Sequence, residues 1–278
     1  MASITDCVVE GLKYPFNDLK RLLTLGGVFA VISAISVFMS VKSFEIYTTI
    51  IHMIEKSSNV PMSPALLFKV PANDIYLVVG LAVITFIISL FILGYQYDIV
   101  KFSILKRDDL PGFNEIVGLF IRGIKYFLVV LAYNIIPIIV LLLGVTVAGY
   151  SFAPYAIVIS AVLFMIAFFL QIMALNNMVA HDELKKAFDF REILDNIANL
   201  GWGKYIGIIV FTLIIYMIIM VAVIFILSII TVAFAASISN QAFVISVVIS
   251  VIEGLFVDSY GALFFNRVYG SVYRESVK

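Results

Sequence analysis

Apolar residues gather into six long runs along the chain, and nearly every charged residue lies outside these runs. Each run is about 20 residues long, which is the length that an α-helix needs to cross the hydrocarbon core of a bilayer. In water, such runs would expose more apolar surface than one protein interior can absorb. The pattern therefore predicts six transmembrane helices, which are expected at Leu22–Val41, Ile75–Leu93, Phe127–Val147, Tyr155–Leu175, Tyr205–Ile230 and Ala242–Leu263.

Composition agrees with a membrane location and excludes other classes of protein. The mean hydropathy is +1.13, and 63% of the residues are hydrophobic. With 18 basic and 18 acidic residues the formal charge is zero, so nucleic acid is not expected as a partner. Cys7 is the single cysteine of the sequence, which excludes an intrachain disulfide and a thiolate metal cluster.

Basic residues are distributed unevenly between the two sides that six spans would create. Only Lys42, Lys56 and Lys69 fall on one side, and all three are expected in the loop between the first two runs. The rest of the 18 basic residues fall on the other side. Basic residues stay on the cytoplasmic side during insertion. We therefore expect a protein of the cell membrane with both termini in the cytoplasm.

Short motifs recur at corresponding positions of the chain. A glycine, a lysine and a tyrosine occur together where each odd-numbered run begins or just before it. A glycine stands four residues before an aspartate at the cytoplasmic ends of the second and sixth runs. They favour three repeated units, roughly 1–98, 111–178 and 190–263, within a single transmembrane domain covering 1–278. Convergence is the alternative, because Lys and Tyr favour the membrane boundary in any protein. The motifs are Gly11-Leu12-Lys13-Tyr14, Gly123-Ile124-Lys125-Tyr126, Gly203-Lys204-Tyr205, Gly94 to Asp98 and Gly254 to Asp258.

Two segments between the runs have the spacing of amphipathic helices. In Pro111–Lys125 and in Phe190–Leu200, apolar residues recur every three or four positions and polar residues take the opposite side. Both segments are expected to lie along the cytoplasmic surface of the membrane. The predicted fold class is an all-α integral membrane protein with six transmembrane helices as three hairpin repeats, and with short amphipathic interfacial helices on the cytoplasmic side.

Several of these motifs also resemble a known family. They are Gly11 to Phe16 with Asp18 and Gly26-Gly27, Leu93-Gly94-Tyr95, Asp109-Leu110-Pro111, Gly123-Ile124-Lys125 and Tyr133 to Pro137. Together they are similar to the archaeal and bacterial membrane proteins of domain of unknown function family 4013, over most of the first four helices. Gly112 departs from the pattern, which has an acidic residue there. The resemblance implies a polytopic membrane protein without a known reaction.

Common catalytic motifs are missing from the sequence. His52 and His181, the two histidines, lie in different segments and do not form the His-Glu-x-x-His helix of a zinc protease. There is no glycine-rich phosphate loop ending in Lys-Ser or Lys-Thr, and no Gly-x-Ser-x-Gly nucleophile turn. We therefore expect a protein that is not an enzyme and that needs no metal or other cofactor.

Polar side chains inside the runs are the candidates for function, because an ionised group at the centre of a transmembrane helix costs about 2.5–3.5 kcal/mol. Glu253, near the middle of the sixth run, shares a helical stripe with Ser246 and Ser250. In the alternative, Glu253 is protonated or hydrogen bonded to a neighbouring helix and only holds the bundle together. The predicted substrate- or ion-binding residues are Glu253, Tyr260 on the same stripe, Asn134 in the third run and Gln171 in the fourth.

A second hypothesis concerns the cytoplasmic ends of the even-numbered runs. A basic residue stands nine positions after Asp98, after Asn177 and after Asp258. Nine residues of a helix separate the two side chains by about 13 Å, so each base would reach the polar residue of the adjacent unit and close a ring. Ordinary solvation of helix ends is the alternative. The predicted cytoplasmic polar ring consists of Asp98, Arg107, Asn177, Lys186, Asp258 and Arg267.

Two classes of function remain open from the sequence. The chain is either a permease-like or lipid-handling protein with a polar cavity in the membrane, or a non-catalytic membrane scaffold or interaction protein with a tightly packed bundle. Membrane lipids are expected partners in both cases, and a protein partner at the cytoplasmic face in the second. A cavity beside Glu253 distinguishes the two.

Overall fold

The computed structural model describes residues 4–56, 71–146, 153–237 and 242–278. Throughout these ranges the chain is helical apart from short turns and bends, and contains no strand. Lys42 and Lys56 do not lie in a loop, as the sequence suggested, because both belong to helix α2 (Leu19–Lys56). Lys69, the third basic residue of that side, lies outside the described residues.

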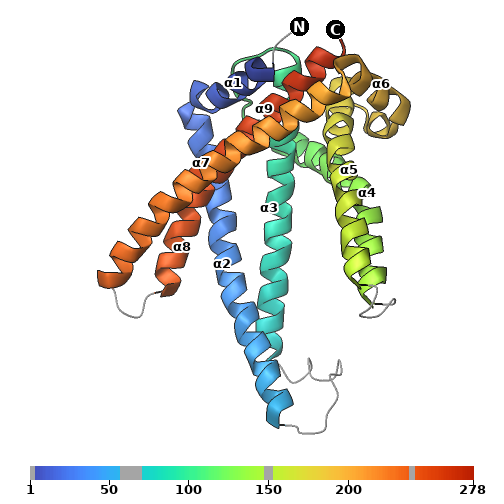
Figure 1. Cartoon of the computed structure of the whole chain (residues 1–278). Helices are drawn as coiled ribbons and strands as arrows, with labels where there is room; N and C mark the ends of the chain where they lie inside the picture. The colour runs from blue at the N-terminus through green and yellow to red at the C-terminus, as the bar shows by residue number, and fades with distance from the viewer. Residues whose placement is uncertain (1–3, 57–70, 147–152, 238–241) are drawn as a thin grey trace. The chain divides into compact units, whose positions relative to one another are not determined.

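All six predicted spans are helices that are long and apolar enough to cross a membrane. Each helix is longer than its apolar run, because the polar residues that flank the runs are also good helix formers. Figure 1 shows the helices in chain order. They are α2, α3 (Ala72–Ile104), α4 (Ile116–Thr146), α5 (Ala153–His181), α7 (Trp202–Ser237) and a sixth formed by α8 (Ala242–Ile252), the π-helical segment η4 (Glu253–Asp258) and α9 (Ser259–Ser276).

Helix α7 shows most clearly that the apolar surface needs lipid. Only 6% of its most apolar stretch is buried. Large side chains such as Ile218, Val221 and Phe225 are more than half exposed. A helix that is apolar on all sides and exposed is stable only where hydrocarbon surrounds it. The all-helical fold and the exposed apolar helices define a multi-pass membrane protein.

Four short elements complete the described chain. Helix α1 (Ile4–Lys13) and the 3₁₀ turn η1 (Tyr14–Asn17) precede the first span, and η3 (Leu184–Phe188) leads into α6 (Phe190–Leu200). The side chain of Asp189 accepts a hydrogen bond from the backbone N–H of Glu192 and so caps the start of α6. Gly201, with φ of 91°, follows its last residue.

The amphipathic segments predicted between the runs have different outcomes. Phe190–Leu200 is a separate helix, α6. The expectation of a separate helix over Pro111–Lys125 is wrong, because residues 111–115 are not helical and the helix that begins at Ile116 continues into the span as α4. The physical reason is that Pro111 and Gly112 oppose a helix before Ile116, whereas no proline occurs after it until Pro137.

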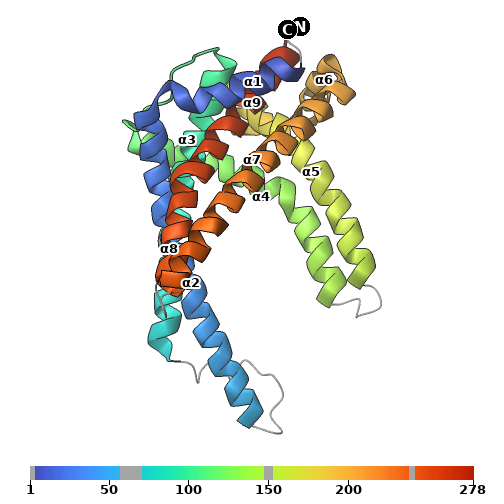
Figure 2. The ribbon, with the colours of Figure 1, turned by 60° about the vertical axis from the view of Figure 1, so that its left-hand side comes forward.

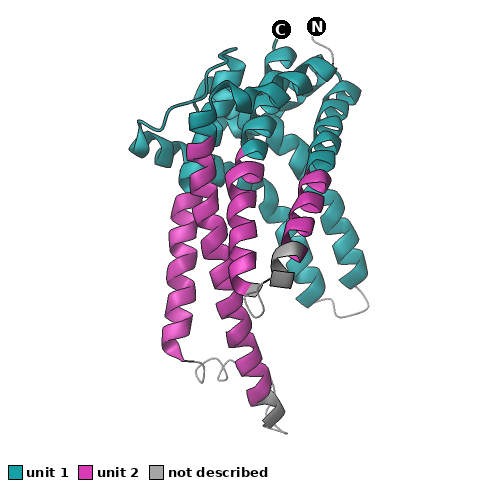
Figure 3. Cartoon of the chain, turned by 90° about the vertical axis from the view of Figure 1, so that its left-hand side faces the viewer, with its two compact units in different colours: residues 1–22, 90–219, 260–278 teal, residues 23–89, 220–259 magenta. Residues whose placement is uncertain are grey.

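By its internal contacts the described chain forms two compact units, which Figure 3 shows in different colours. Unit 1 consists of residues 1–22, 90–219 and 260–278, and unit 2 of residues 23–89 and 220–259. Each unit is therefore assembled from separate stretches of chain. The three repeated units of the sequence are a different division of the chain, and their repetition remains a prediction.

Unit 1 contains a buried core and two close pairs of helices. The core includes Met173, Ile197, Tyr205 and Phe264, all with no exposed surface. Helices α4 and α5 lie side by side, as the views in Figures 1 and 2 agree. Helices α3 and α4 approach until their backbones touch, since a Cβ atom at Gly123 would lie 1.8 Å from the carbonyl oxygen of Leu90. Small residues at such crossings are typical of membrane helices.

Unit 2 has a helix crossing of the same kind between α2 and the sixth span. A Cβ atom at Gly26 would lie 2.1 Å from the carbonyl oxygen of Leu255. A Cβ atom at Gly254 would lie 2.8 Å from the backbone nitrogen of Ala30. These two glycines therefore let the backbone of α2 contact the π-helical segment η4, which positions the polar residues described next.

Candidate functional site

Two rows of hydroxyl groups lie on helices of unit 2. On α2, Ser33, Ser36 and Ser40 are spaced by three and four residues, which puts them on one face of the helix. On α8, Ser246 and Ser250 are spaced by four residues, and Glu253 continues the same face at the start of η4. The row on α8 was recognised from the sequence. The row on α2 was missed, although its helical spacing was visible within the first run.

The two rows line one cavity of about 790 Å³ in unit 2, which is open to the surroundings and not enclosed by protein. The sequence predicted a polar pocket around Glu253, and Glu253 lines this cavity. Apolar and aromatic side chains of the same two helices form the remaining wall. The full lining is Phe29, Ile32, Ser33, Ser36, Val37, Ser40, Val41, Phe243, Ser246, Ser250, Glu253 and Asp258.

The π-helical turn decides which residues accompany Glu253. In an α-helix, residues three, four and seven positions after Glu253 lie on its side, which is why Tyr260 was predicted to join it. A π-helix bonds each residue to the fifth along, and Asp258, five positions after Glu253, lines the cavity. Tyr260 is not in the lining. It belongs to unit 1, where its hydroxyl donates a 3.3 Å hydrogen bond to the Leu12 carbonyl.

The two carboxylates of the cavity are unpaired. Within the part of the chain that the structure describes, neither Glu253 nor Asp258 has a hydrogen-bonding or ionic partner. Both are half-buried. A carboxylate in a membrane-crossing helix ordinarily faces protein or water and is paired. This cavity therefore holds two acceptor groups whose charge the described protein does not neutralise.

Asn134 and Gln171 form a separate polar pair in unit 1. The Asn134 Nδ2 donates to the Gln171 Oε1 at 2.7 Å and to the Val130 carbonyl at 2.7 Å. The bond to Gln171 joins α4 to α5, and the bond to Val130 lies within α4. Such hydrogen bonds are typical of polar groups on membrane helices. The structure thus brings Asn134 and Gln171 together, but they do not line the cavity that contains Glu253.

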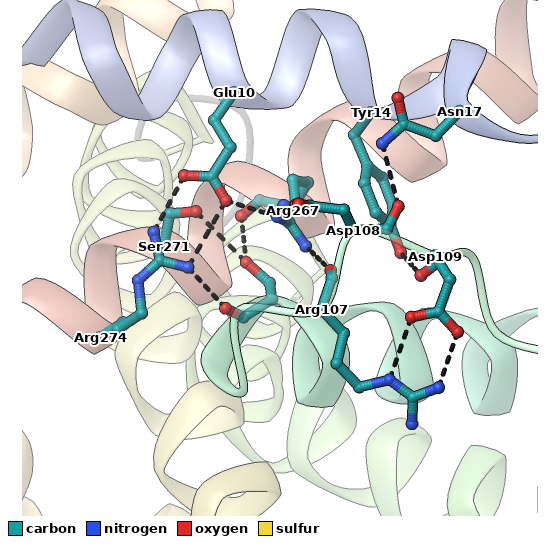
Figure 4. Close-up of polar contacts among 10 residues, drawn as sticks. Glu10, Tyr14, Asn17, Arg107, Asp108, Asp109, Arg267, Ser271 and Arg274 are labelled. Atoms are coloured by element: carbon teal, nitrogen blue, oxygen red, sulfur yellow. Dashed lines mark hydrogen bonds and ion pairs between the residues drawn. The ribbon is translucent and has the colours of Figure 1, made fainter.

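Unit 1, in contrast, contains a network of paired charged residues, which Figure 4 shows. At its centre the Arg267 side chain is only 2% exposed. One guanidinium nitrogen lies 2.7 Å from Glu10 and 2.7 Å from Asp108. The other terminal nitrogen donates to the Arg107 carbonyl, and the guanidinium stacks over the Tyr14 ring. Both terminal nitrogens of this buried cation therefore have acceptors, whereas its Nε has no hydrogen-bond partner among the described residues.

Arg274, which lies about two helical turns after Arg267 on α9, extends the network. Its guanidinium donates to Glu10 at 2.9 Å and to the Ser103 carbonyl at 2.7 Å. Burial alone would raise the pKa of the Glu10 carboxyl, but the hydrogen bond from Arg274 and the positive charge of Arg267 outweigh it and lower the pKa. Glu10 is thus held ionised, and it fastens α1 to α9.

Two residues of the predicted cytoplasmic ring, Asp98 and Arg107, pair with residues outside the ring. Arg122 donates to Asp98 at 2.9 Å, and Arg107 makes a two-pronged contact with Asp109. Asp258 lines the cavity of unit 2. Sequence reasoning missed Arg122 as the partner of Asp98, and no spacing signal pointed to it, because the two residues come from different helices.

The middle pair of the predicted ring is brought together through the backbone. The Asn177 Nδ2 donates to the Lys186 carbonyl at 3.0 Å, and the Asn177 Oδ1 accepts from the Tyr273 hydroxyl at 2.8 Å. The Lys186 ammonium turns instead to Glu192 at 2.6 Å. These contacts close the turn between α5 and α6. A ring that acts as one functional unit remains a prediction.

Comparison with known proteins places the chain in a family. The sequence model of the family described as "Protein of unknown function (DUF4013)" matches residues 77–228, which is more than half of the chain. The chain therefore belongs to this family, which confirms the resemblance found in its motifs. No curated protein and no solved structure matches the chain.

Proposed function

We propose that this protein is a permease-like membrane protein whose ligand occupies the cavity lined by Glu253 and Asp258. The observation that carries the proposal is a cavity of about 790 Å³ with two unpaired carboxylates and two rows of serines on membrane-crossing helices. Ligand sites in proteins have volumes of about 300–1,000 Å³ and few, well-placed polar groups. In this reading the serine rows exist to contact water or ligand.

The energetic argument is that a surface of carboxylates and serine hydroxyls is unfavourable in contact with lipid alone. Each charged group at the centre of a membrane helix costs about 2.5–3.5 kcal/mol. Serine hydroxyls inside a membrane are typically bonded to a neighbouring helix or to water. Hydration or a polar ligand in the cavity offsets this cost for Glu253, and Asp258 lies toward the cytoplasmic end of the same predicted span.

The rest of the proposal concerns location and partners. We place the protein in the cell membrane with both termini in the cytoplasm, because most of its basic residues lie on that side of the predicted topology. There α1 and α6 act as interfacial helices in contact with lipid headgroups. The protein acts without a catalytic step, and the three hairpin units arose by repetition.

A non-catalytic scaffold is the competing proposal, and the densely paired charges of unit 1 favour it. The ion pairs of Glu10, Arg267 and Arg274 fasten a rigid cytoplasmic face of the kind that a protein partner would bind. That reading assigns no role to the cavity of unit 2. It predicts that the cavity is closed to water in the membrane.

Cysteine labelling distinguishes the two proposals. Cys7 is replaced by serine, and single cysteines are introduced as Ser36→Cys and Ser250→Cys, which line the cavity. Ser228→Cys on α7 is the matched control, because Ser228 is exposed but outside the cavity. Thiols react as thiolates, which need water. A charged maleimide should therefore label the two cavity positions at least about tenfold faster than the control.

Equal and slow labelling at all three positions would overturn the permease proposal and leave the scaffold. The measurement uses the full chain in native membrane vesicles. Each variant is first checked for folding by its elution as a single species in detergent.

A further inference from the structure

We infer that the ligand of this cavity is an organic cation, an amine or a quaternary ammonium compound. The inference rests on the proposed function and goes beyond it by naming the chemical class of the ligand. Its basis is the charge, the size and the wall of the cavity taken together.

The charge of the lining selects for a cation. Glu253 and Asp258 each carry a negative charge when ionised, and no lysine, arginine or histidine lines the cavity. The described part of the chain supplies neither carboxylate with a counter-ion. An anion would be repelled by both groups, and a neutral ligand would leave both uncompensated in the membrane. A cation is attracted by both groups, and a single ammonium charge compensates one of the two.

The size and ligand set favour an organic cation over a metal ion. Calcium takes six to eight oxygen ligands at about 2.3–2.6 Å. A cavity of about 790 Å³ is far larger than such a shell. Among the described residues, no three His, Cys, Asp or Glu side chains lie close enough together to hold a metal. The site therefore has the volume for a molecule of many atoms and too few charged ligands for a bare divalent ion.

The wall of the cavity suits the body of such a molecule. Phe29, Ile32 and Phe243 contribute apolar and aromatic surface to the same cavity. Aromatic faces attract ammonium groups by about 0.5–2 kcal/mol, more when water is excluded. The serine hydroxyls can accept hydrogen bonds from N–H groups. Carboxylates, aromatic rings and hydroxyls in one cavity thus match the charged head and apolar body of an organic amine.

Probes that differ in charge test the inference, and two of them, choline and neohexyl alcohol, have the same shape. Choline and benzyltrimethylammonium are the cationic probes, and neohexyl alcohol is the neutral carbon isostere of choline. Binding to the purified full-length protein is measured by calorimetry, and uptake of radiolabelled choline by reconstituted vesicles. We expect either cationic probe to bind at least about tenfold more tightly than the alcohol. Calcium chloride is tested in the same way, to distinguish an organic cation from a metal ion.

Variants connect the preference to the two carboxylates. Glu253→Gln and Asp258→Asn should each weaken binding of the cationic probe by at least about tenfold. Glu45→Gln is the matched control, because Glu45 lies on α2 of the same unit, pairs with Lys42 at 2.7 Å and is outside the cavity. It should leave binding unchanged. If one carboxylate variant does not fold, the other gives the same test.

The failure of this inference is distinct from the failure of the permease proposal. Binding of the alcohol or of calcium as tight as that of both cationic probes, or no binding of either cationic probe, overturns the organic cation. Wild-type binding that survives in both carboxylate variants also overturns it. The permease proposal falls only if the cysteines that line the cavity remain unlabelled.

Discussion

The two compact units differ in whether their buried and half-buried charged side chains are paired. In unit 1, Arg267 is almost fully buried and contacts Glu10 and Asp108 at 2.7 Å. In unit 2, Glu253 and Asp258 line a cavity and have no partner among the described residues. A buried ion pair holds two segments together, and removing one partner lowers the stability of the fold. An unpaired charge holds no segments together, so its presence points to a ligand.

Helix packing does not explain this difference, because both units pack helices in the same manner. Gly94 and Gly123 bring α3 against α4 in unit 1, and Gly26 and Gly254 bring α2 against η4 in unit 2. Close backbone contact at glycine is a general device of membrane helices. The units therefore share a way of packing and differ in what their polar residues contact. The following predictions test that contrast, from the largest expected effect to the smallest.

Removing the central cation of unit 1 should have the largest effect on stability. In Arg267→Leu the carboxylates of Glu10 and Asp108 lose their shared partner. Breaking a buried ion pair costs about 3–5 kcal/mol, and a loss near the lower limit is expected here, because Glu10 keeps Arg274 as a partner and Asp108 is exposed. The free energy of unfolding is measured in mixed detergent with the full chain. Arg191→Leu on α6 is the control, because Arg191 is exposed and should cost less than about 0.5 kcal/mol. Equal losses in the two variants would show that the network does not fasten unit 1.

The glycine crossing of unit 1 should be next in magnitude. A Cβ atom in Gly123→Ala would lie 1.8 Å from the Leu90 carbonyl oxygen, so α3 and α4 must separate. Overpacking of this kind costs about 1–3 kcal/mol. Gly203→Ala is the control, because nothing lies within 4 Å of its added Cβ and alanine favours a helix. The same unfolding measurement should show a loss for the first variant and no loss for the second.

Acid should remove the contribution of Glu10 to unit 1. The pKa of Glu10 is lowered from its ordinary value of 4.5, so its stabilising effect is complete above 4.5 and is lost as the pH falls through the lowered folded-state pKa. The free energies of unfolding of the wild type and Glu10→Gln should differ at neutral pH and converge in acid. A difference that stays constant down to about pH 3 would contradict an ionised Glu10 in the folded state.

Removing an unpaired charge of unit 2 should have the smallest effect on stability. Glu253→Gln breaks no ion pair, and it removes a charge that is costly in a membrane helix. Its free energy of unfolding without added ligand should equal that of the wild type within about 0.5 kcal/mol, or exceed it. A loss as large as that of Arg267→Leu would mean that Glu253 holds the bundle together, which is the alternative that the sequence left open.

Long-range contacts within unit 1 illustrate what could not be foreseen from the chain. Glu10 and Arg267 lie near opposite ends of the sequence, and no repeat or spacing connects them. Asp98 and Arg122 likewise come from different helices. A charge on a helix end has many neighbours of opposite sign within reach, and only the packing of α1, α3, α4 and α9 selects one. The predicted ring named several participating residues but not their partners.

The six membrane-crossing helices, the all-α fold and the polar stripe of Ser246, Ser250 and Glu253 were determined by the sequence alone. Their signals are local, because the bilayer thickness sets the length of an apolar run and the helical period sets which residues share a face. The tertiary structure alone decided that the serine row of α2 shares a cavity with that stripe, and that Asp258 replaces Tyr260 there. The reason is that one π-helical turn and two glycine contacts, which no local pattern encodes, rotate and seat η4 against α2.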